Sequence, residues 1–378
     1  MTEFADRALL PAGLRDLLPP YAAHEADMVG RLMAAFGAEG YERVKPPLIE
    51  FEESLLTGSG AATAPHTFRV MDPVSQRMMG VRADMTLQVA RIATTRLANV
   101  PRPLRLSYAG EVLRVKGSQL RPERQFGQAG IELIGSDTAE ADAEVIILAA
   151  QALMDLGMQG VSVDLSLPTL GGLIVDGPFP EGLRDALDRK DAAGVAALGG
   201  SVSGLLGTLV AAVGPAEPAL AQLGALDLPP LAAQLCRRLA KVVALLREAA
   251  PGLILTIDPV ENRGFEYHTG IAFTIFARHW SGELGRGGCY QAQGESATGV
   301  TLFMDTVLDA LAGPAAVRRL FIPAGVINRA QAAKLRQEGW VTVAGLAKDG
   351  ADPAAEARRL GCDHFVIDGG RVVPVDQS

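Results

Sequence analysis

The twelve residues RQFGQAGIELIG, at positions 124–135, constrain the fold more than any other stretch of the chain. Successive side chains of a strand point to opposite faces, so Phe126, Gln128, Gly130, Glu132 and Ile134 would share one face. Gln128 and Glu132 would then lie about 13–14 Å apart along the strand, with a glycine between them. The pattern predicts a strand with an amide and a carboxylate on one face. A solvated surface strand is the alternative for such a polar face.

The surrounding sequence predicts an α+β fold around this strand. Residues 104–116 are expected to form a second strand, joined to the first by a polar loop. Asp137 is expected to open a helix with Glu140 as its capping-box partner, and Gly157 to close it. Further helices are expected at 20–38 and 83–100, and further strands at 41–44, 161–165 and 253–257.

Changes in composition divide the chain into three parts. Residues 171–252 are rich in small residues and leucines with helical spacing, which indicates a helical insertion. The flanking segments, 1–170 and 253–313, are expected to form one core. Gly313-Pro314 marks a break, and 314–378 is predicted to be a small, truncated α/β domain.

Composition excludes several classes of function. The net charge of −8 opposes a broad surface for nucleic acid, because affinity for phosphate backbones comes largely from Lys and Arg. The three cysteines and five histidines are scattered, which argues against a metal site or a disulfide framework. No basic segment followed by an apolar core opens the chain, and the apolar run 145–154 is too short to span a bilayer. These features predict a cytoplasmic protein that does not bind membranes.

Two further segments bear candidate binding residues. RGFEYHTG, residues 263–270, gathers Arg263, Tyr267 and His268 before a probable core strand. VRADMT, residues 81–86, places Asp84 and Thr86 where a helix is expected to begin. Asp and Thr also cap helices routinely, so these last two residues alone indicate little.

Together these segments resemble the catalytic core of histidyl-tRNA synthetase, a class II aminoacyl-tRNA synthetase, over roughly residues 10–310. PAGLRDLLPP (11–20) is similar to the opening G-x-R-D-x-L-P of that family, and VRADMT to its R-P-E-G-T turn. EVLRVKGSQLRPERQFGQAGIE (111–132) resembles motif 2, and RGFEYHTG resembles the histidine-specific R-G-L-D-Y-Y-T-G. GRGGCY (285–290) and GVTLFMDTVL (299–308) resemble G-G-R-Y-D and motif 3.

The resemblance implies a fold and a ligand. The fold is an antiparallel sheet flanked by helices, which dimerises through motif 1 at residues 20–48. The ligand is L-histidine, with Arg263 suited to its carboxylate and the acidic residues to its ammonium group. A structural ion pair is the alternative for Arg263 and Glu132. The implied histidine-binding residues are Asp84, Thr86, Arg114, Gln128, Glu132, Arg263, Tyr267 and His268.

The departures from the synthetase pattern concern ATP. Motif 2 keeps Arg114, but Lys116 stands where a glutamate is expected, and Gly117 where an arginine is expected. Motif 3 has Asp305-Thr306 in place of its Glu-Arg pair. Each lost contact is worth about 1.5–3 kcal/mol, so the sequence predicts a chain that does not activate histidine, needs no cofactor and has no catalytic residues.

A synthetase-like chain of this kind resembles the regulatory subunit of ATP phosphoribosyltransferase. That resemblance implies a complex with the short-form catalytic subunit, typically a hetero-octamer built on a homodimer core, acting in the first step of L-histidine biosynthesis. It implies activation and histidine feedback inhibition, without tRNA. A divergent active histidyl-tRNA synthetase and a synthetase-like protein for another amino acid are the alternatives.

Overall fold

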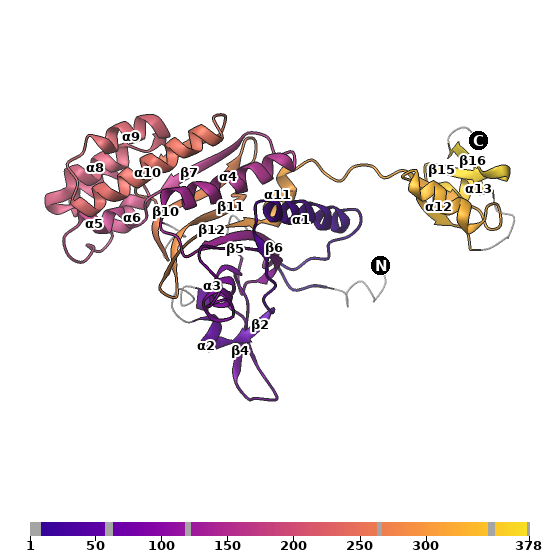
Figure 1. Cartoon of the computed structure of the whole chain (residues 1–378), viewed down its shortest axis with the longest axis horizontal. Helices are drawn as coiled ribbons and strands as arrows, with labels where there is room; N and C mark the ends of the chain where they lie inside the picture. Colours follow the sequence, from indigo (N-terminus) through magenta and orange to yellow (C-terminus); the bar gives the residue numbers. More distant parts are fainter. Residues whose placement is uncertain (1–8, 57–62, 118–121, 263–266, 347–351, 376–378) are drawn as a thin grey trace. The chain divides into compact units, whose positions relative to one another are not determined.

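The computed structural model describes residues 9–56, 63–117, 122–262, 267–346 and 352–375. The chain folds into two compact units, Met1–Gly313 and Pro314–Ser378 (Figure 1). None of the described helices is both long and apolar enough to cross a membrane.

A nine-stranded sheet forms the centre of the first unit within the described residues. All pairings from β5 to β7 in the sheet order are antiparallel, which confirms the expected antiparallel core. Two pairs near the edges, β1–β5 and β7–β9, are parallel. In sheet order the strands are β1 (Glu42–Arg43), β5 (Leu104–Leu113), β6 (Gln125–Ile134), β12 (Glu295–Phe303), β11 (Gly285–Ala292), β10 (His268–Ala277), β7 (Val161–Ser166), β9 (Ile254–Asp258) and β8 (Gly214–Pro215).

Helices cover one face of this sheet. They are α1 (Tyr21–Ala38), α4 (Ala139–Asp155) and α11 (Met304–Ala310). The odd-numbered residues Ala129, Ile131 and Leu133 of β6 point toward these helices and belong to the largest hydrophobic cluster. Because side chains alternate along β6, the even-numbered residues Gln128 and Glu132 point to the opposite side of the sheet.

The opposite face carries the shorter helix α3 (Thr86–Thr95), which contacts β5, β6 and β11. Its apolar side packs on Leu106, Tyr108 and Tyr290. A small three-stranded sheet precedes α3 in the chain, together with α2 (Glu52–Leu55). Its strands in sheet order are β2 (Ile49–Phe51), β4 (Met78–Val81) and β3 (Arg69–Met71).

Helices make up most of the segment 171–252, which was expected to be a helical insertion. The longest, α10 (Pro230–Ala249), begins with proline at its first position and packs along α4 of the core (Figure 1). The others are α5 (Leu170–Ile174), α6 (Leu183–Asp188), α7 (Ala192–Leu198), α8 (Ser203–Ala211) and α9 (Ala216–Gly224).

Two helices differ in their bounds from the expectation. The capping box at Asp137 and Glu140 is wrong: Thr138 is the N-cap of α4, and its hydroxyl accepts from the Ala141 amide at 3.2 Å. The Asp137 carboxylate instead pairs with Arg238 of α10. The helix expected at 83–100 spans only Thr86–Thr95, and the Asp84 carboxylate before it accepts from the Thr86 amide at 2.9 Å.

In its described residues, 314–346 and 352–375, the second unit has a four-stranded sheet, two α-helices and a hydrophobic core of its own. The alternation of strands and helices expected after Leu320 is present. The elements are β13 (Arg319–Ile322), α12 (Arg329–Gln337), β14 (Val341–Ala344), α13 (Pro353–Arg359), β15 (His364–Ile367) and β16 (Arg371–Pro374).

Candidate functional site

Glu132 is a buried carboxylate at the centre of the sheet, only 1% exposed. Tyr108 of β5 donates its hydroxyl to Oε1 of Glu132 at 3.1 Å, and Tyr290 of β11 donates to Oε2 at 2.9 Å. Tyr290 lies two strands away, and it reaches Glu132 because Gly299 of the intervening β12 is paired with Glu132 and has no side chain. Gly130 likewise leaves room for the ring of Tyr108, whose hydroxyl would lie 2.5 Å from a Cβ there.

Burial decides the protonation state of this carboxylate. The pKa of Glu132 is raised to about 8: burial is the largest cause and the nearby Asp84 adds to it, whereas hydrogen bonds with Tyr290, Thr86 and Tyr108 act in the opposite direction. Below pH 8 Glu132 is therefore mostly protonated. A cation entering this site would favour the ionised form, since an opposite charge lowers the pKa of a carboxyl group.

Gln128 and Asp84 form a second polar pair on the same side of the sheet. Gln128, 1% exposed, donates from Nε2 to Oδ2 of Asp84 at 3.0 Å and accepts from the Met85 amide at 3.1 Å. Asp84 in turn accepts from the Thr86 amide, as described above. Strand β6 thus fixes the first turn of α3 through Gln128 and positions Thr86 at the Glu132 site.

Tyr267 and His268 form an aromatic wall of the same site. Their ring centroids lie 4.1 Å apart, and the ring of Tyr267 meets that of Tyr290 edge-on, with centroids 6.1 Å apart. His268 is 5% exposed at the start of β10.

Of the eight residues expected at the site, seven are described, and four of these line one cavity. Arg114 lies beside the turn before α3: its Nε donates to the Ala83 carbonyl at 3.3 Å, and its guanidinium covers the ring of Phe126. Arg263 lies outside the described residues. Asp84 and Gln128 contact each other next to the cavity. The four that line it are Thr86, Glu132, Tyr267 and His268.

Other residues line the cavity or hold Glu132 and were not expected at the site. Tyr290, in the segment GRGGCY, lines the cavity and donates to Glu132, and Tyr108 of the neighbouring strand β5 donates to Glu132 as well. Thr301 of β12 shares a hydrogen bond with the Tyr108 hydroxyl at 2.7 Å. Arg286 also lines the cavity, with its Nε donating to Glu283 at 2.7 Å. Alternation within β5 was the signal that could have identified Tyr108.

Two cavities meet at His268. The inner cavity, at Glu132, encloses about 10 Å³, which is room for about one water molecule. The outer one is larger, about 950 Å³, and is lined by residues of α5 and α6 together with Asn262 and His268. The inner cavity holds the buried ionisable group Glu132, and groups of this kind cluster at functional sites. The walls of the outer cavity include the exposed side chains Arg184, Asp185 and Arg189.

Comparison with known proteins identifies the class. The family model for histidyl-tRNA synthetase matches residues 13–307. Among solved structures, an ATP phosphoribosyltransferase regulatory subunit/histidyl-tRNA synthetase from Bacillus halodurans superposes with a TM-score of 0.78 at 23% identity, covering 93% of this chain and 96% of that chain. The first unit therefore has the fold of the catalytic core of a class II histidyl-tRNA synthetase.

A more similar relative narrows the family. A protein of Paramagnetospirillum magneticum named ATP phosphoribosyltransferase regulatory subunit is 64% identical, over 96% of this chain and 97% of its own length. The chain belongs to the family of ATP phosphoribosyltransferase regulatory subunits. A chain of the ATP phosphoribosyl transferase complex from Thermotoga maritima shares the fold, with a TM-score of 0.58 at 19% identity, over 74% of this chain and 97% of that one.

Proposed function

We propose that this chain binds free L-histidine at Glu132 and thereby regulates a short-form ATP phosphoribosyltransferase catalytic subunit in the first step of L-histidine biosynthesis. It both activates that subunit and mediates its feedback inhibition. The observation that carries the proposal is the buried Glu132 carboxyl, held by two tyrosine hydroxyls beside Tyr267 and His268.

The chemistry of the site suits a small, flat, polar cation. Glu132 accepts either the α-ammonium group or an imidazole N–H, and Asp84 adds negative charge nearby. Tyr267 and His268 offer ring surfaces for an imidazole. Arg263, from the sequence, is the partner for the ligand carboxylate. Two orientations of histidine satisfy these groups, and in both Glu132 is ionised.

Binding requires the site to open. The inner cavity has room for about one water molecule, which is less than an amino acid needs. His268 lines both cavities and the ring of Tyr267 lies against it, so displacement of these two side chains would join the inner cavity to the outer one. The closed form is then the histidine-free state, and histidine selects an open one.

The absence of catalysis in this chain is part of the proposal. Asp305 and Thr306 occupy the first turn of α11, where the synthetase pattern has a glutamate and an arginine for ATP. A carboxylate and a hydroxyl offer no positive charge to a nucleotide phosphate. In this proposal the chain keeps an amino-acid site, while its motif 3 segment lacks the cation that would stabilise the charge developed in adenylation.

The proposed partner is the catalytic subunit that the names of the relatives imply. The 64% identical relative is named a regulatory subunit, and the Thermotoga maritima neighbour was solved in an ATP phosphoribosyl transferase complex. We propose a homodimer core through α1 and the strand that follows it, and a hetero-octamer in which two such dimers assemble with four catalytic chains. tRNA has no role in this proposal.

Reconstitution with the catalytic subunit tests the proposal. Phosphoribosyl-ATP formation should rise when this chain is added and fall when histidine is titrated. Glu132→Ala and Arg263→Ala should keep the complex assembled and active but insensitive to histidine. Full inhibition of both variants would place the histidine sensor elsewhere. Histidine-dependent exchange of pyrophosphate into ATP by the chain alone would favour the active synthetase instead.

A further inference from the structure

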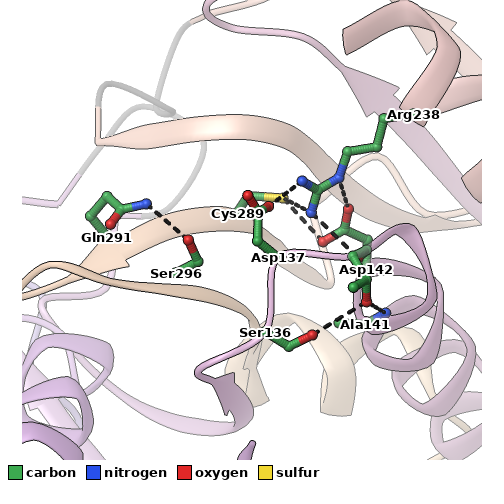
Figure 2. Close-up of polar contacts among 9 residues, drawn as sticks. Ser136, Asp137, Ala141, Asp142, Arg238, Cys289, Gln291 and Ser296 are labelled. Carbon is green, nitrogen blue, oxygen red and sulfur yellow. Dashed lines mark hydrogen bonds and ion pairs between the residues drawn. The ribbon is translucent and has the colours of Figure 1, made fainter. Parts of the chain in front are cut away.

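Arg238 of α10 fastens the helical insertion to the core. Its Nε donates to Oδ2 of Asp142 at 2.8 Å, its Nη1 pairs with Asp137, and its Nη2 donates to the Thr138 carbonyl at 3.4 Å (Figure 2). Asp142, in the first turn of α4, has a side chain only 3% exposed. A carboxylate buried this deeply needs a charged partner, so the position of α10 is tied to the beginning of α4.

The same cluster reaches the central sheet through Cys289 of β11. The Cys289 thiol donates to Oδ1 of Asp142 at 3.1 Å and accepts from Nη2 of Arg238 at 3.7 Å (Figure 2). Cys289 also fills the space beside Gly270 of β10, where a Cβ would lie 3.0 Å from that of Cys289. The side chain is 7% exposed, because it packs against α4 and β10 of the core and against α10 of the insertion.

Cys289 and Tyr290 are consecutive residues that point to opposite faces of the sheet. Cys289 belongs to the hydrophobic cluster on the helix-covered side, and Tyr290 to the cluster around α3. Tyr290 donates to Glu132 at 2.9 Å. The insertion and the histidine site are thus connected by an unbroken series of contacts that crosses the sheet at two adjacent residues.

We infer that Arg238 and Cys289 are positioning residues that couple the docking of α10 to the occupancy of the Glu132 site. The inference rests on the proposed function. A ligand that becomes the new partner of Glu132 changes the hydrogen bond from Tyr290, and a shift of β11 there moves Cys289 against Asp142 and Arg238. Linkage requires the reverse effect too, so firm docking of α10 strengthens histidine binding by the same factor.

Hydrogen exchange on the full chain, with and without saturating histidine, tests the coupling. In the wild type, histidine should slow amide exchange in α10 about threefold or more, because stabilised docking suppresses local opening. Cys289→Ala leaves the Arg238–Asp142 ion pair in place and removes the contact with β11. That variant and Arg238→Ala should lose the slowing, and calorimetry should show histidine affinity about 5-fold or more below wild type.

Matched variants separate coupling from general damage. Arg247→Ala, on the same helix, removes an ion pair with Glu217 at 2.6 Å that contacts neither α4 nor β11, and it should leave both measurements unchanged. Cys289→Ser keeps a donor for Asp142 and should restore the slowing lost in Cys289→Ala. If Arg238→Ala does not fold, Cys289→Ala decides the question, since it removes a single sulfur atom.

Each outcome has a distinct meaning. Wild-type affinity and wild-type slowing of α10 in Cys289→Ala would overturn the coupling while leaving the proposed function intact. The same holds if histidine binds the wild type but leaves exchange in α10 unchanged. No binding of histidine to the wild type would overturn the proposed function itself.

Discussion

Oε2 of Glu132 lies 1.8 Å from the position that a Cβ at Gly299 would occupy, on the strand that pairs directly with it. The carboxylate therefore occupies the place of the missing side chain, and this brings it within 2.9 Å of the Tyr290 hydroxyl. The Ile131 carbonyl oxygen also lies 2.9 Å from this Cβ position, so the backbone limits the space for a side chain at residue 299 as well.

Gly299→Ala should abolish this arrangement. The added methyl group displaces the Glu132 carboxyl from Tyr290, and a lost hydrogen bond to a charged group costs about 1.5–3 kcal/mol. Histidine affinity, measured by calorimetry, should fall about tenfold or more. Gly207→Ala is the control, since a Cβ there, within α8, meets nothing within 4 Å. Unchanged affinity in Gly299→Ala would mean that Glu132 is not the histidine partner.

Histidine binding should release a proton near neutral pH. Burial raises the pKa of Glu132 to about 8, so this group is mostly protonated at pH 7 and must ionise to pair with the ligand cation. The apparent affinity should rise toward pH 8 and level off above it. Calorimetry in buffers of different ionisation enthalpy measures the released proton. Glu132→Gln should bind without this release, and equal release from both proteins would contradict the assignment.

The same pKa predicts how stability depends on pH. The raised pKa means that the folded chain holds a proton that the unfolded chain loses near pH 4.5. The contribution of Glu132 to stability is therefore full below pH 4.5 and is lost as pH rises through 8. Relative to wild type, Glu132→Gln should gain stability between pH 5 and 8, by roughly 3–5 kcal/mol at most. Urea unfolding at several pH values measures it, and parallel curves for the two proteins would refute it.

Arg82 should be important for stability rather than for binding. It is 6% exposed and donates to three backbone carbonyls, those of Glu111 at 2.7 Å, Pro46 at 3.0 Å and Pro47 at 3.5 Å. Arg82→Met leaves these acceptors without their donor and should lower the free energy of unfolding by about 3 kcal/mol. Urea denaturation measures the loss. Arg77→Met, which removes an exposed ion pair with Glu53, should cost below about 1 kcal/mol.

The sequence predicted the local features of this site well. Period-two alternation placed Gln128 and Glu132 on one face of β6, and that face is the one that carries the cavity. The antiparallel core and the helical content of the insertion were also accessible, because periodicity and turn residues determine them locally. The roles of the eight expected residues in histidine binding remain predictions.

Contacts between distant segments could not be predicted in this way. The bond between Tyr290 and Glu132 depends on β12 lying between their strands and on Gly299 falling opposite Glu132, which is a matter of register. Asp137 has the local pattern of a helix cap, but Arg238, about a hundred residues later in the chain, provides a charged partner instead. Local preference yields to tertiary contacts wherever these are stronger.

The near absence of free space at Glu132 has a kinetic consequence for the proposed sensor. A ligand that cannot enter the closed form must wait for Tyr267 and His268 to open, so its association rate should stop increasing once histidine is abundant. Dissociation waits for the same opening, which lengthens the residence time of bound histidine. Such a sensor does not respond to changes in histidine concentration that last for less than its opening time. It responds to the histidine concentration averaged over longer intervals.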